Sequence, residues 1–319
     1  MSKDNVLGVD ISKSTFDVAL LLDDKVKTKK FCNKKKGFIE LNEWLKKKNV
    51  TDLHICMEAT GSYGEALATY LFEQNYKVSV VNPAQIKGFA QSELSRNKTD
   101  RADAQLIARF CRALAPKLWA PKPLHVRTLQ AWVRRLESLQ AMHNQENNRF
   151  DVSLDPVQSS IKKIMKKLAT EIEKVKKKIH DHIEQHPDLQ TKSKLLETIP
   201  GVGEATISQI LAFMGNVEDF NNAKQFAAFV GLNPKQRQSG TSVNGRTRLS
   251  KIGKSNLRKA FYMPAITAKK YNPNIKKFCE GLIEKGKPPM LIIGAVMRKL
   301  VHIIFGVLKS GKPFEVRLA

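Results

Sequence analysis

Four acidic residues have the types and spacing that phosphodiester chemistry requires. Asp10 lies near the end of a short apolar stretch, and Glu58 directly follows another. Asp100 and Asp103 are three residues apart at the start of a predicted helix, so both face the same way. Hard Mg²⁺ prefers oxygen ligands, and a pair of such ions needs several carboxylates that converge on one point. Taken singly, each acid has a structural alternative: Asp10 suits a strand-end turn, and Asp100 suits a helix N-cap with Asp103 at N3.

The elements around these acids predict that they converge. Three leading strands, then helix, strand, helix and strand, indicate an α/β domain, and this is the order of a ribonuclease-H-like fold. In that order the ends of the first and fourth strands and the start of a late helix lie at one edge. Arg96, Lys98 and Arg101 flank the last acid pair and suit phosphate contacts. The strands are predicted at 5–12, 16–22, 26–32, 53–57 and 77–81, and the helices at 38–45, 64–75 and 100–114.

The strongest compositional signal is a basic region in the second half of the chain. Between Asp219 and Glu280 there are 13 Lys and Arg residues and not one acidic residue. A Gly-, Ser- and Asn-rich stretch at 231–247 predicts a loop at its centre. The residues expected to contact phosphates are Lys235, Arg237, Arg246, Arg248, Lys251, Lys254, Arg258 and Lys259.

Three hydroxyl residues of this loop are candidate nucleophiles: Ser239, Thr241 and Ser242. A serine ester with a DNA phosphate conserves bond energy, so strands can be cut and rejoined without an outside energy source. No histidine is close in sequence to act as a base. A metal-bound hydroxide or a carboxylate of the first domain would therefore have to activate the hydroxyl. The alternative is that these hydroxyls only bind phosphates.

Helical segments occupy most of the remaining chain. From 124 to 190, two amphipathic stretches that break near 151–156 predict a helical hairpin or an intermolecular coiled coil, with a simple spacer as the alternative. The turn Pro200–Gly203 between two helices is typical of a helix-hairpin-helix, in which Gly201 and Gly203 let backbone N–H groups meet a phosphate. Such a turn is sometimes only a packing device.

These patterns predict three domains. They are an α/β nuclease domain at 1–118, a long helical coiled-coil arm at 119–190, and a mostly α-helical domain with the helix-hairpin-helix and the serine loop at 191–319. In the last domain, helices are predicted at 223–230, 253–271, 274–286 and 288–309.

The charge of the chain points to a polyanionic partner. The net charge is +25, with a surplus of 5 basic residues in 1–115 and of 20 in 116–319. Self-repulsion of this size favours nucleic acid binding, with an anionic membrane as the competing interpretation. The longest apolar stretch, 290–308, is interrupted by Arg298, Lys299 and His302, which indicates a buried helix and no membrane span.

The cysteines and the N-terminus bear on the compartment. The four cysteines are scattered without a CxxC pair, which favours reduced thiols in a cytosol and argues against zinc. No apolar signal region precedes the first strand, so a cytoplasmic protein is expected.

Six segments, in a fixed order over nearly the whole chain, match one known family. They are GVDISKSTFDVAL (8–20), MEATGSY (57–63), NKTDRADAQLIA (97–108), IPGVGEATISQILAFMG (199–215), FAAFVGLNP (226–234) and QSGTSVNGRTRLSKIGKSNLRKA (238–260). On these segments the chain resembles the bacterial insertion-sequence transposases that pair a RuvC-like DEDD domain with a serine-bearing C-terminal domain. The Piv-type DNA invertases are relatives of that family.

The resemblance implies specific roles. It implies that Asp10, Glu58, Asp100 and Asp103 hold Mg²⁺, and that Ser239 forms a phosphoserine link to DNA. It also implies donor and target DNA as substrates, a homo-oligomer bridged by the arm, and a composite site in which Ser239 of one protomer meets the acids of another. A noncoding guide RNA from the element's own flank is expected, in a bacterial, nucleoid-associated protein.

Two alternatives differ from this expectation. A junction-resolving nuclease would use the four carboxylates with water as the nucleophile, so Ser239→Ala would leave it active. A non-catalytic nucleic-acid-binding protein would tolerate Asp10→Ala. With many basic residues, binding is also expected to weaken steeply with salt, by roughly −0.9 in the log–log slope per neutralised phosphate.

Overall fold

The structure, a computed structural model, describes residues 5–23, 25–48, 50, 52–59, 61, 63–94, 99–239 and 243–316. At 237–239, 243, 244 and 246 it describes the backbone alone. The chain forms two compact units, Met1–Pro121 and Lys122–Ala319. The expected domain boundaries after 118 and after 190 remain a prediction.

The first unit is built around a five-stranded sheet in the predicted element order. Its strands are β1 (Val6–Ile11), β2 (Thr15–Leu22), β3 (Lys25–Cys32), β4 (His54–Glu58) and β5 (Lys77–Val81), and α1 (Lys35–Lys46) and α2 (Glu65–Glu73) lie between the last three. The sheet order is β3-β2-β1-β4-β5, with antiparallel pairing from β1 to β3 and parallel pairing of β4 with β1 and β5. The α/β class predicted for the first domain is confirmed.

Two further helices complete this unit. No element is predicted over 82–99, yet α3 spans Pro83–Ser92. Its start has a strong local signal, because the Asn82 side chain accepts a hydrogen bond from the backbone N–H of Ala84 at 2.9 Å and Pro83 occupies the first turn. Helix α4 (Asp100–Leu114) begins where the sequence predicts it.

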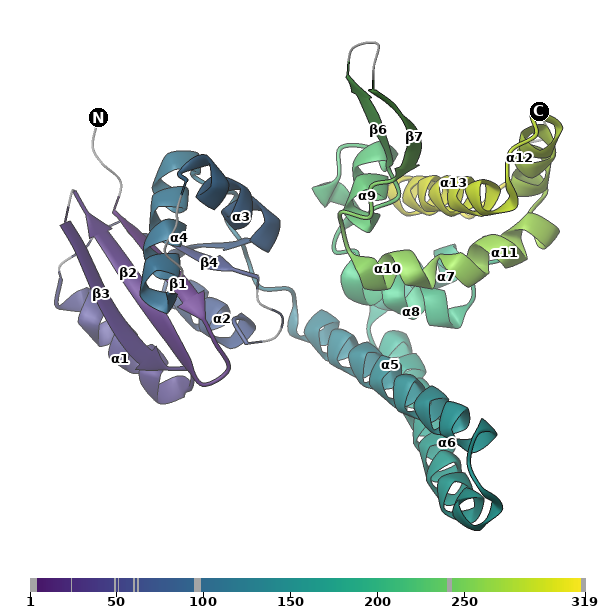
Figure 1. Ribbon diagram of the computed structural model, residues 1–319, viewed down its shortest axis with the longest axis horizontal. Helices are drawn as coiled ribbons and strands as arrows, with labels where there is room; N and C mark the ends of the chain where they lie inside the picture. Colours follow the sequence, from purple (N-terminus) through teal and green to yellow (C-terminus); the bar gives the residue numbers. More distant parts are fainter. Residues whose placement is uncertain are drawn as a thin grey trace. The chain divides into compact units, whose positions relative to one another are not determined.

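Different helices cover the two faces of the sheet (Figure 1). Leu7 and Val9 of β1 pack into the apolar layer under α1 and α2. Val6 packs on the other side with Ile107 of α4. Because successive strand residues point to opposite faces, Gly8 and Asp10 belong to the face that α4 covers.

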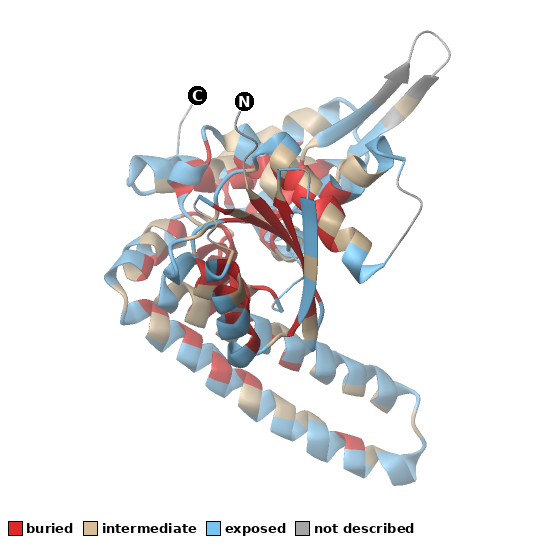
Figure 2. Cartoon of the chain, turned by 90° about the vertical axis from the view of Figure 1, so that its left-hand side faces the viewer, coloured by how far each residue is buried: buried red, intermediate tan, exposed pale blue. Residues whose placement is uncertain are grey.

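The second unit begins with a long helical hairpin. Helices α5 (Leu124–Asp151) and α6 (Asp155–Glu184) pack on each other along a narrow buried stripe, and the rest of their surface is exposed or intermediate (Figure 2). The break between them falls where the sequence predicts it. Leu129 and Val133 on α5 and Val175 and Ile179 on α6 belong to the same buried core.

The remaining helices of this unit form one core around a central apolar helix. They are α7 (Pro187–Glu197), α8 (Glu204–Phe213), the 3₁₀ turn η1 (Val217–Asp219), α9 (Ala223–Val230), α10 (Ser255–Ala260), α11 (Tyr262–Tyr271), α12 (Pro273–Glu284) and α13 (Pro289–Ser310). The single helix predicted over 253–271 is therefore two helices. The mostly helical character predicted for this region is confirmed.

The loop predicted over 231–247 is wrong. Strands β6 (Pro234–Ser239) and β7 (Val243–Leu249) pair as an antiparallel hairpin, with Lys235 opposite Arg248. The Gly, Ser and Asn residues of this segment favour a loop, but its basic residues recur at every second position. Lys235 and Arg237 do so in β6, and Arg246 and Arg248 do so in β7. That alternation is typical of a strand, since every second residue shares a face.

By length and composition, one helix of the described chain could cross a membrane. It is α13, which has 22 residues. Half of its most apolar stretch is buried inside the second unit, where the helix packs against α7, α9, α11 and α12. The buried face of α13 thus belongs to the apolar core of the second unit.

Candidate active site

A row of charged side chains crosses three strands on the α4 face of the sheet. In the strand register, Asp10 of β1 lies opposite Asp17 of β2, and Asp17 lies opposite Lys30 of β3. Cross-strand partners point to the same face of a sheet. Glu58 ends β4, one residue beyond the pair formed by Val9 and Met57, so it stands level with Asp10.

Helix α4 approaches this row very closely because β1 carries a glycine. A Cβ added to Gly8 would lie 2.1 Å from the carbonyl oxygen of Ala104 and 2.3 Å from the backbone nitrogen of Ala108. Only a residue without a side chain permits this backbone-to-backbone contact. The contact sets the first turn of α4, with Asp100 and Asp103, over the end of β1.

Thr99 is the residue that caps α4. Its hydroxyl oxygen accepts a hydrogen bond from the backbone N–H of Ala102 at 3.2 Å. Asp100 is therefore the first helical residue and leaves its carboxylate available, contrary to its alternative interpretation as the N-cap. Acidic residues in a first turn are favoured by the positive end of the helix dipole.

A side chain next to the site joins the two loops that border it. The Asn33 amide donates hydrogen bonds to the carbonyl oxygen of Ser12 at 2.9 Å and to that of Tyr63 at 3.1 Å. Ser12 lies in the turn after Asp10, and Tyr63 lies in the loop after Glu58. Asn33 thus connects the turn after β1 to the loop after β4.

The electrostatics show that the carboxylates are close neighbours. The pKa of Asp10 is raised from 3.8 to about 6, first by burial and then by the nearby charges of Asp103, Asp100, Glu58 and Asp17, in that order of importance. The pKa of Glu58 is also raised, by burial first and by Asp103 second. The structure therefore brings together all four acids singled out in the sequence and adds a fifth, Asp17.

The donor set fits a hard divalent cation by its chemistry. All five groups are carboxylates, and their mutual repulsion, seen in the raised pKa of Asp10, is what a bound cation relieves. In their present positions, no three His, Cys, Asp or Glu side chains of the described residues stand close enough together to hold a metal ion.

Lys30 forms two ion pairs within the cluster. Its Nζ lies 3.2 Å from Oδ2 of Asp17 and 3.6 Å from Oδ2 of Asp100. The hydrogen bond that the Lys30 ammonium donates to Asp17 is the main cause that raises the pKa of Lys30, and Asp100 adds to it. Neither Lys30 nor Asp17 is apparent from local motifs. Strand pairing is the signal that could have found them. Counting residues outward from the two turns between the predicted strands places Lys30 opposite Asp17 and Asp17 opposite Asp10.

The basic residues expected beside the acid pair are only partly described. Arg101 is exposed on the first turn of α4. Arg96 and Lys98 lie outside the described residues.

The candidate nucleophile belongs to the second unit. Ser239 is the last residue of β6 and lies opposite Val243 across the hairpin. Its side chain lies outside the described part of the structure, as do the side chains of Arg237 and Arg246 and all of Thr241 and Ser242.

Most of the described basic residues around this hairpin are exposed. They are Lys235, Arg248, Lys251, Lys254 and Lys259. Arg258 differs, because its guanidinium donates hydrogen bonds to the carbonyl oxygens of Val230 at 3.3 Å and Lys251 at 3.0 Å. It therefore ties the end of α9 to the segment after β7.

The two glycines of the turn between α7 and α8 have different surroundings. Gly201 has a positive φ of 99°, and a Cβ there would lie 2.7 Å from the side chain of Ala268 on α11. A Cβ on Gly203 would meet nothing within 4 Å. Gly201 thus packs against α11, whereas Gly203 opens α8, which has no side-chain cap.

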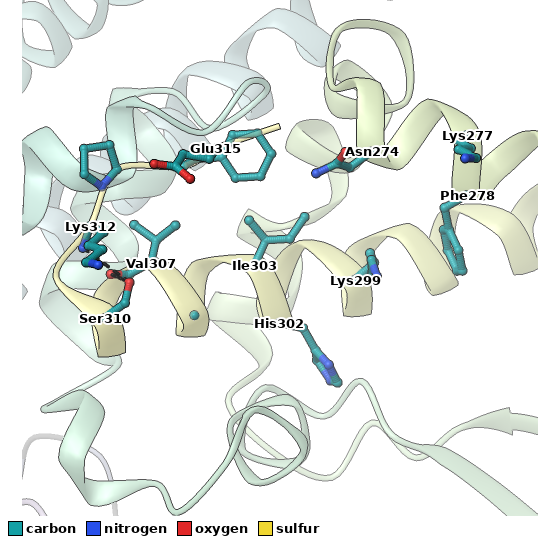
Figure 3. Close-up of a pocket in the computed structure, with 13 residues that line it drawn as sticks. Asn274, Lys277, Phe278, Lys299, His302, Ile303, Val307, Ser310, Lys312 and Glu315 are labelled. Carbon is teal, nitrogen blue, oxygen red and sulfur yellow. Dashed lines mark hydrogen bonds between the residues drawn. The ribbon is translucent and has the colours of Figure 1, made fainter. Parts of the chain in front are cut away.

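A separate cavity of about 620 Å³ lies along α13. Ile303 and Val307 point from α13 toward α12 and the C-terminal segment, whereas His302 points to the opposite side of the helix (Figure 3). Burial, with Arg298, Lys299 and Lys224 nearby, lowers the pKa of His302. None of the candidate site residues lines this cavity.

Comparisons with known proteins show the family to which the chain belongs. Residues 7–158 match the DEDD family of IS110 elements, described as a transposase, and residues 193–280 match the transposase family IS116/IS110/IS902. The pilin gene-inverting proteins of Moraxella lacunata and Moraxella bovis are each 34% identical over 322 aligned residues, which cover 100% of this chain and 99% of theirs. The transposase for insertion sequence element IS1111A of Coxiella burnetii is 25% identical over 215 residues, 58% of each chain.

Proposed function

Because the chain belongs to the IS110/IS116 family of transposases, recombinases that act on DNA, we propose that it cuts and rejoins DNA strands with Ser239 as nucleophile and Mg²⁺ held by a carboxylate site. Its biological role is to move an insertion sequence. The observation that carries this proposal is the convergence of four predicted acids on one sheet edge, seen in the raised pKa of Asp10.

The first unit supplies the metal site. Asp10, Glu58, Asp100 and Asp103 would hold one or two Mg²⁺ ions, which stabilise charge on the phosphate oxygens during strand transfer. The sheet order, with three antiparallel strands followed by two parallel ones, supports a ribonuclease-H-like, RuvC-type fold for this unit. The match to a DEDD transposase family supports the use of a divalent metal.

The second unit supplies the nucleophile. The Oγ–phosphorus bond of Ser239 forms as the bond from phosphorus to the leaving strand breaks. A carboxylate of the acid cluster accepts the serine proton and passes it to the oxygen of the leaving strand, which departs as a hydroxyl. A strand hydroxyl then attacks the phosphoserine and joins the new strands, and its proton returns through the same carboxylate to the released Oγ of Ser239. The position of Ser239 at the end of β6, in a hairpin rich in basic residues, supports this role.

Basic surfaces hold the nucleic acids. The exposed lysines and Arg248 around the hairpin are suited to phosphate contacts, and the uncapped start of α8 at Gly203 supports a helix-hairpin-helix contact. We include a noncoding guide RNA among the partners, in line with the surplus of 20 basic residues in 116–319.

The helical hairpin is proposed to bridge protomers as a coiled coil. Its tip exposes apolar side chains, with Val152 85% and Leu154 79% exposed. Exposed apolar groups of this kind favour a hairpin that contacts another chain over one that only separates two domains. A composite site would then pair Ser239 of one protomer with the carboxylates of another.

The decisive experiment is a trapping assay. Purified protein, Mg²⁺, the flanking noncoding RNA and labelled donor and target DNA are mixed, denatured and separated on a gel. The expected result is a covalent protein–DNA band that is absent from Ser239→Ala and from Asp10→Asn. Asp52→Asn is the matched control, because Asp52 precedes the opposite end of β4 from Glu58 and pairs with Lys77. Cleavage without a covalent band, unchanged in Ser239→Ala, would instead identify a nuclease that uses water.

A second candidate function is DNA inversion by the same chemistry. It is favoured by the full-length similarity at 34% identity to pilin gene-inverting proteins, against 25% over 58% of the chain for the Coxiella transposase. A plasmid with two recombination sites in inverted orientation separates the two outcomes. Inversion changes the restriction pattern of the plasmid, whereas transposition yields a junction between the element's ends and a new target.

A further inference from the structure

We propose that Lys30 is a positioning residue of the carboxylate site, which holds Asp100 and the first turn of α4 in place until a divalent cation takes Asp100. The inference rests on the proposed function, since it treats Asp100 as a metal ligand. It assigns roles to two residues, Lys30 and Asp17, that lie outside the four acids.

The strand register places Lys30 for this task. Asp10, Asp17 and Lys30 occupy matching positions on three adjacent strands, so their side chains form one row on the face below α4. From this row the Lys30 ammonium reaches Asp17 at 3.2 Å and Asp100 at 3.6 Å. One side chain thus connects the third strand of the sheet to the first residue of α4.

The two partners of Lys30 differ in exposure. The side chain of Asp17 is 17% exposed, whereas that of Asp100 is 68% exposed. Asp17 is therefore the fixed anchor of the ammonium, and Asp100 is the partner that is free to exchange it for another cation. Asp17 pairs with Lys30 more closely than Asp100 does, in agreement with this division.

The charge balance of the cluster gives Lys30 its importance. Five carboxylates gather at this edge and repel one another. Within the described part of the chain, Lys30 is the one basic side chain in an ion pair with any of them. Without it, repulsion from Asp10 and Glu58 would drive the first turn of α4 away from the sheet in the metal-free protein.

The choice of lysine also matters. An ammonium on a flexible stem is a point charge that can release a carboxylate, whereas a guanidinium binds a carboxylate through two parallel hydrogen bonds. Lysine at position 30 can hold Asp100 and still give it up to a divalent cation. An arginine would hold it more firmly and compete more strongly with the metal.

The test uses the full-length protein without DNA, so that it does not depend on recombination activity. Wild type, Lys30→Met, Lys30→Arg and Lys27→Met are compared. Lys27 is an exposed lysine of the same strand that points to the other face, so it controls for the loss of one positive charge. Two quantities are measured: hydrogen–deuterium exchange over the first turn of α4, and Mn²⁺ affinity from the electron paramagnetic resonance signal of free Mn²⁺.

We expect Lys30→Met to exchange faster over 100–104 in the metal-free protein and to bind Mn²⁺ more tightly, by roughly tenfold, because the competing cation is gone. At saturating Mn²⁺ its exchange should equal that of wild type. Lys30→Arg should exchange no faster than wild type and bind Mn²⁺ more weakly. Lys27→Met should match wild type in both measurements.

Three results would overturn the proposal. Faster exchange in Lys30→Met with weaker Mn²⁺ binding would mean that Lys30 only supports the fold. Wild-type behaviour of Lys30→Met in both measurements would mean that Lys30 is a bystander, while the metal site itself stands. Failure of wild-type protein to bind Mn²⁺ would remove the metal site of the proposed function, and this inference with it.

Discussion

Replacing Asp10 by asparagine should stabilise the metal-free protein and at the same time abolish its activity. Asparagine keeps the shape of the side chain and removes its charge. The pKa of Asp10 is about 6, against an ordinary value of 3.8, because the carboxylate is partly buried among other acids. A charge in that position is unfavourable for folding and useful only when a cation binds.

The size of the effect follows from the pKa. Each pKa unit corresponds to about 1.4 kcal/mol, so the rise to about 6 would correspond to about 3 kcal/mol for a fully shielded group. Asp10 is only half-buried, and solvent screening reduces this to about 1–2 kcal/mol. For a cooperative unit of this size, the melting temperature should rise by roughly 4–8 °C.

The pH dependence has a definite sign. Because the folded pKa of Asp10 is raised, its contribution to stability is fully present below about pH 3.8 and is lost as the pH rises through about 6. The pKa of Glu58 is raised as well and acts in the same direction. Metal-free wild-type protein should therefore gain stability between pH 7.5 and pH 5, and Asp10→Asn should gain less.

The assay is thermal unfolding of the full-length chain with a chelator present, at pH 7.5 and pH 5, followed by Mg²⁺ addition at pH 7.5. Mg²⁺ should stabilise wild type and have little effect on Asp10→Asn. Asp52→Asn serves as the control, since its exposed ion pair with Lys77 should change stability by no more than about 1 kcal/mol. A lower melting temperature for Asp10→Asn at pH 7.5, or a pH response equal to that of wild type, would refute a repulsive carboxylate cluster around Asp10.

Three further predictions follow from the packing and charge of both units. Gly8→Ala should lose about 1–3 kcal/mol of stability and weaken Mn²⁺ binding, because the new Cβ would meet the backbone of α4. Gly88→Ala is the control, since its Cβ would meet nothing within 4 Å, and equal thermal melts and metal titrations for the two variants would contradict the prediction. Lys235→Ala should lower the steepness of the log–log salt dependence of DNA binding by about 0.9 and leave the melting temperature unchanged, and an unchanged salt dependence would argue against a phosphate contact. Arg258→Ala should instead lower the melting temperature, because its hydrogen bonds to two backbone carbonyl oxygens are lost. Val152→Asp at the tip of the helical hairpin should lower the molar mass of the oligomer measured by light scattering, and an unchanged mass would favour the spacer interpretation. Leu94→Asp, at a similarly exposed apolar position of the first unit, is the control.

Local patterns in the sequence predict most helices and strands, but they predict a loop where the structure has the hairpin of β6 and β7. The five strands, α5 and α6 lie within a few residues of the predicted ranges, because the apolar patterns over 5–32, 53–57, 77–81 and 124–190 are strong. Glycine, serine and asparagine dominate local propensity at 231–247 and predict a loop, whereas the structure forms the hairpin of β6 and β7 there. Cross-strand pairing overrides such propensity, and pairing is not a local property.

What the sequence determined by itself is the chemistry of the chain: four carboxylates at element ends, a basic acid-free region around Ser239, and the order of strands and helices. Tertiary structure decided which side chains meet. Only the packing of α4 on Gly8 sets Asp100 and Asp103 over Asp10, and only the register of three strands brings Lys30 to Asp17. The physical reason is that residue type and periodicity act over a few residues, whereas register and helix docking depend on contacts between segments up to 100 positions apart.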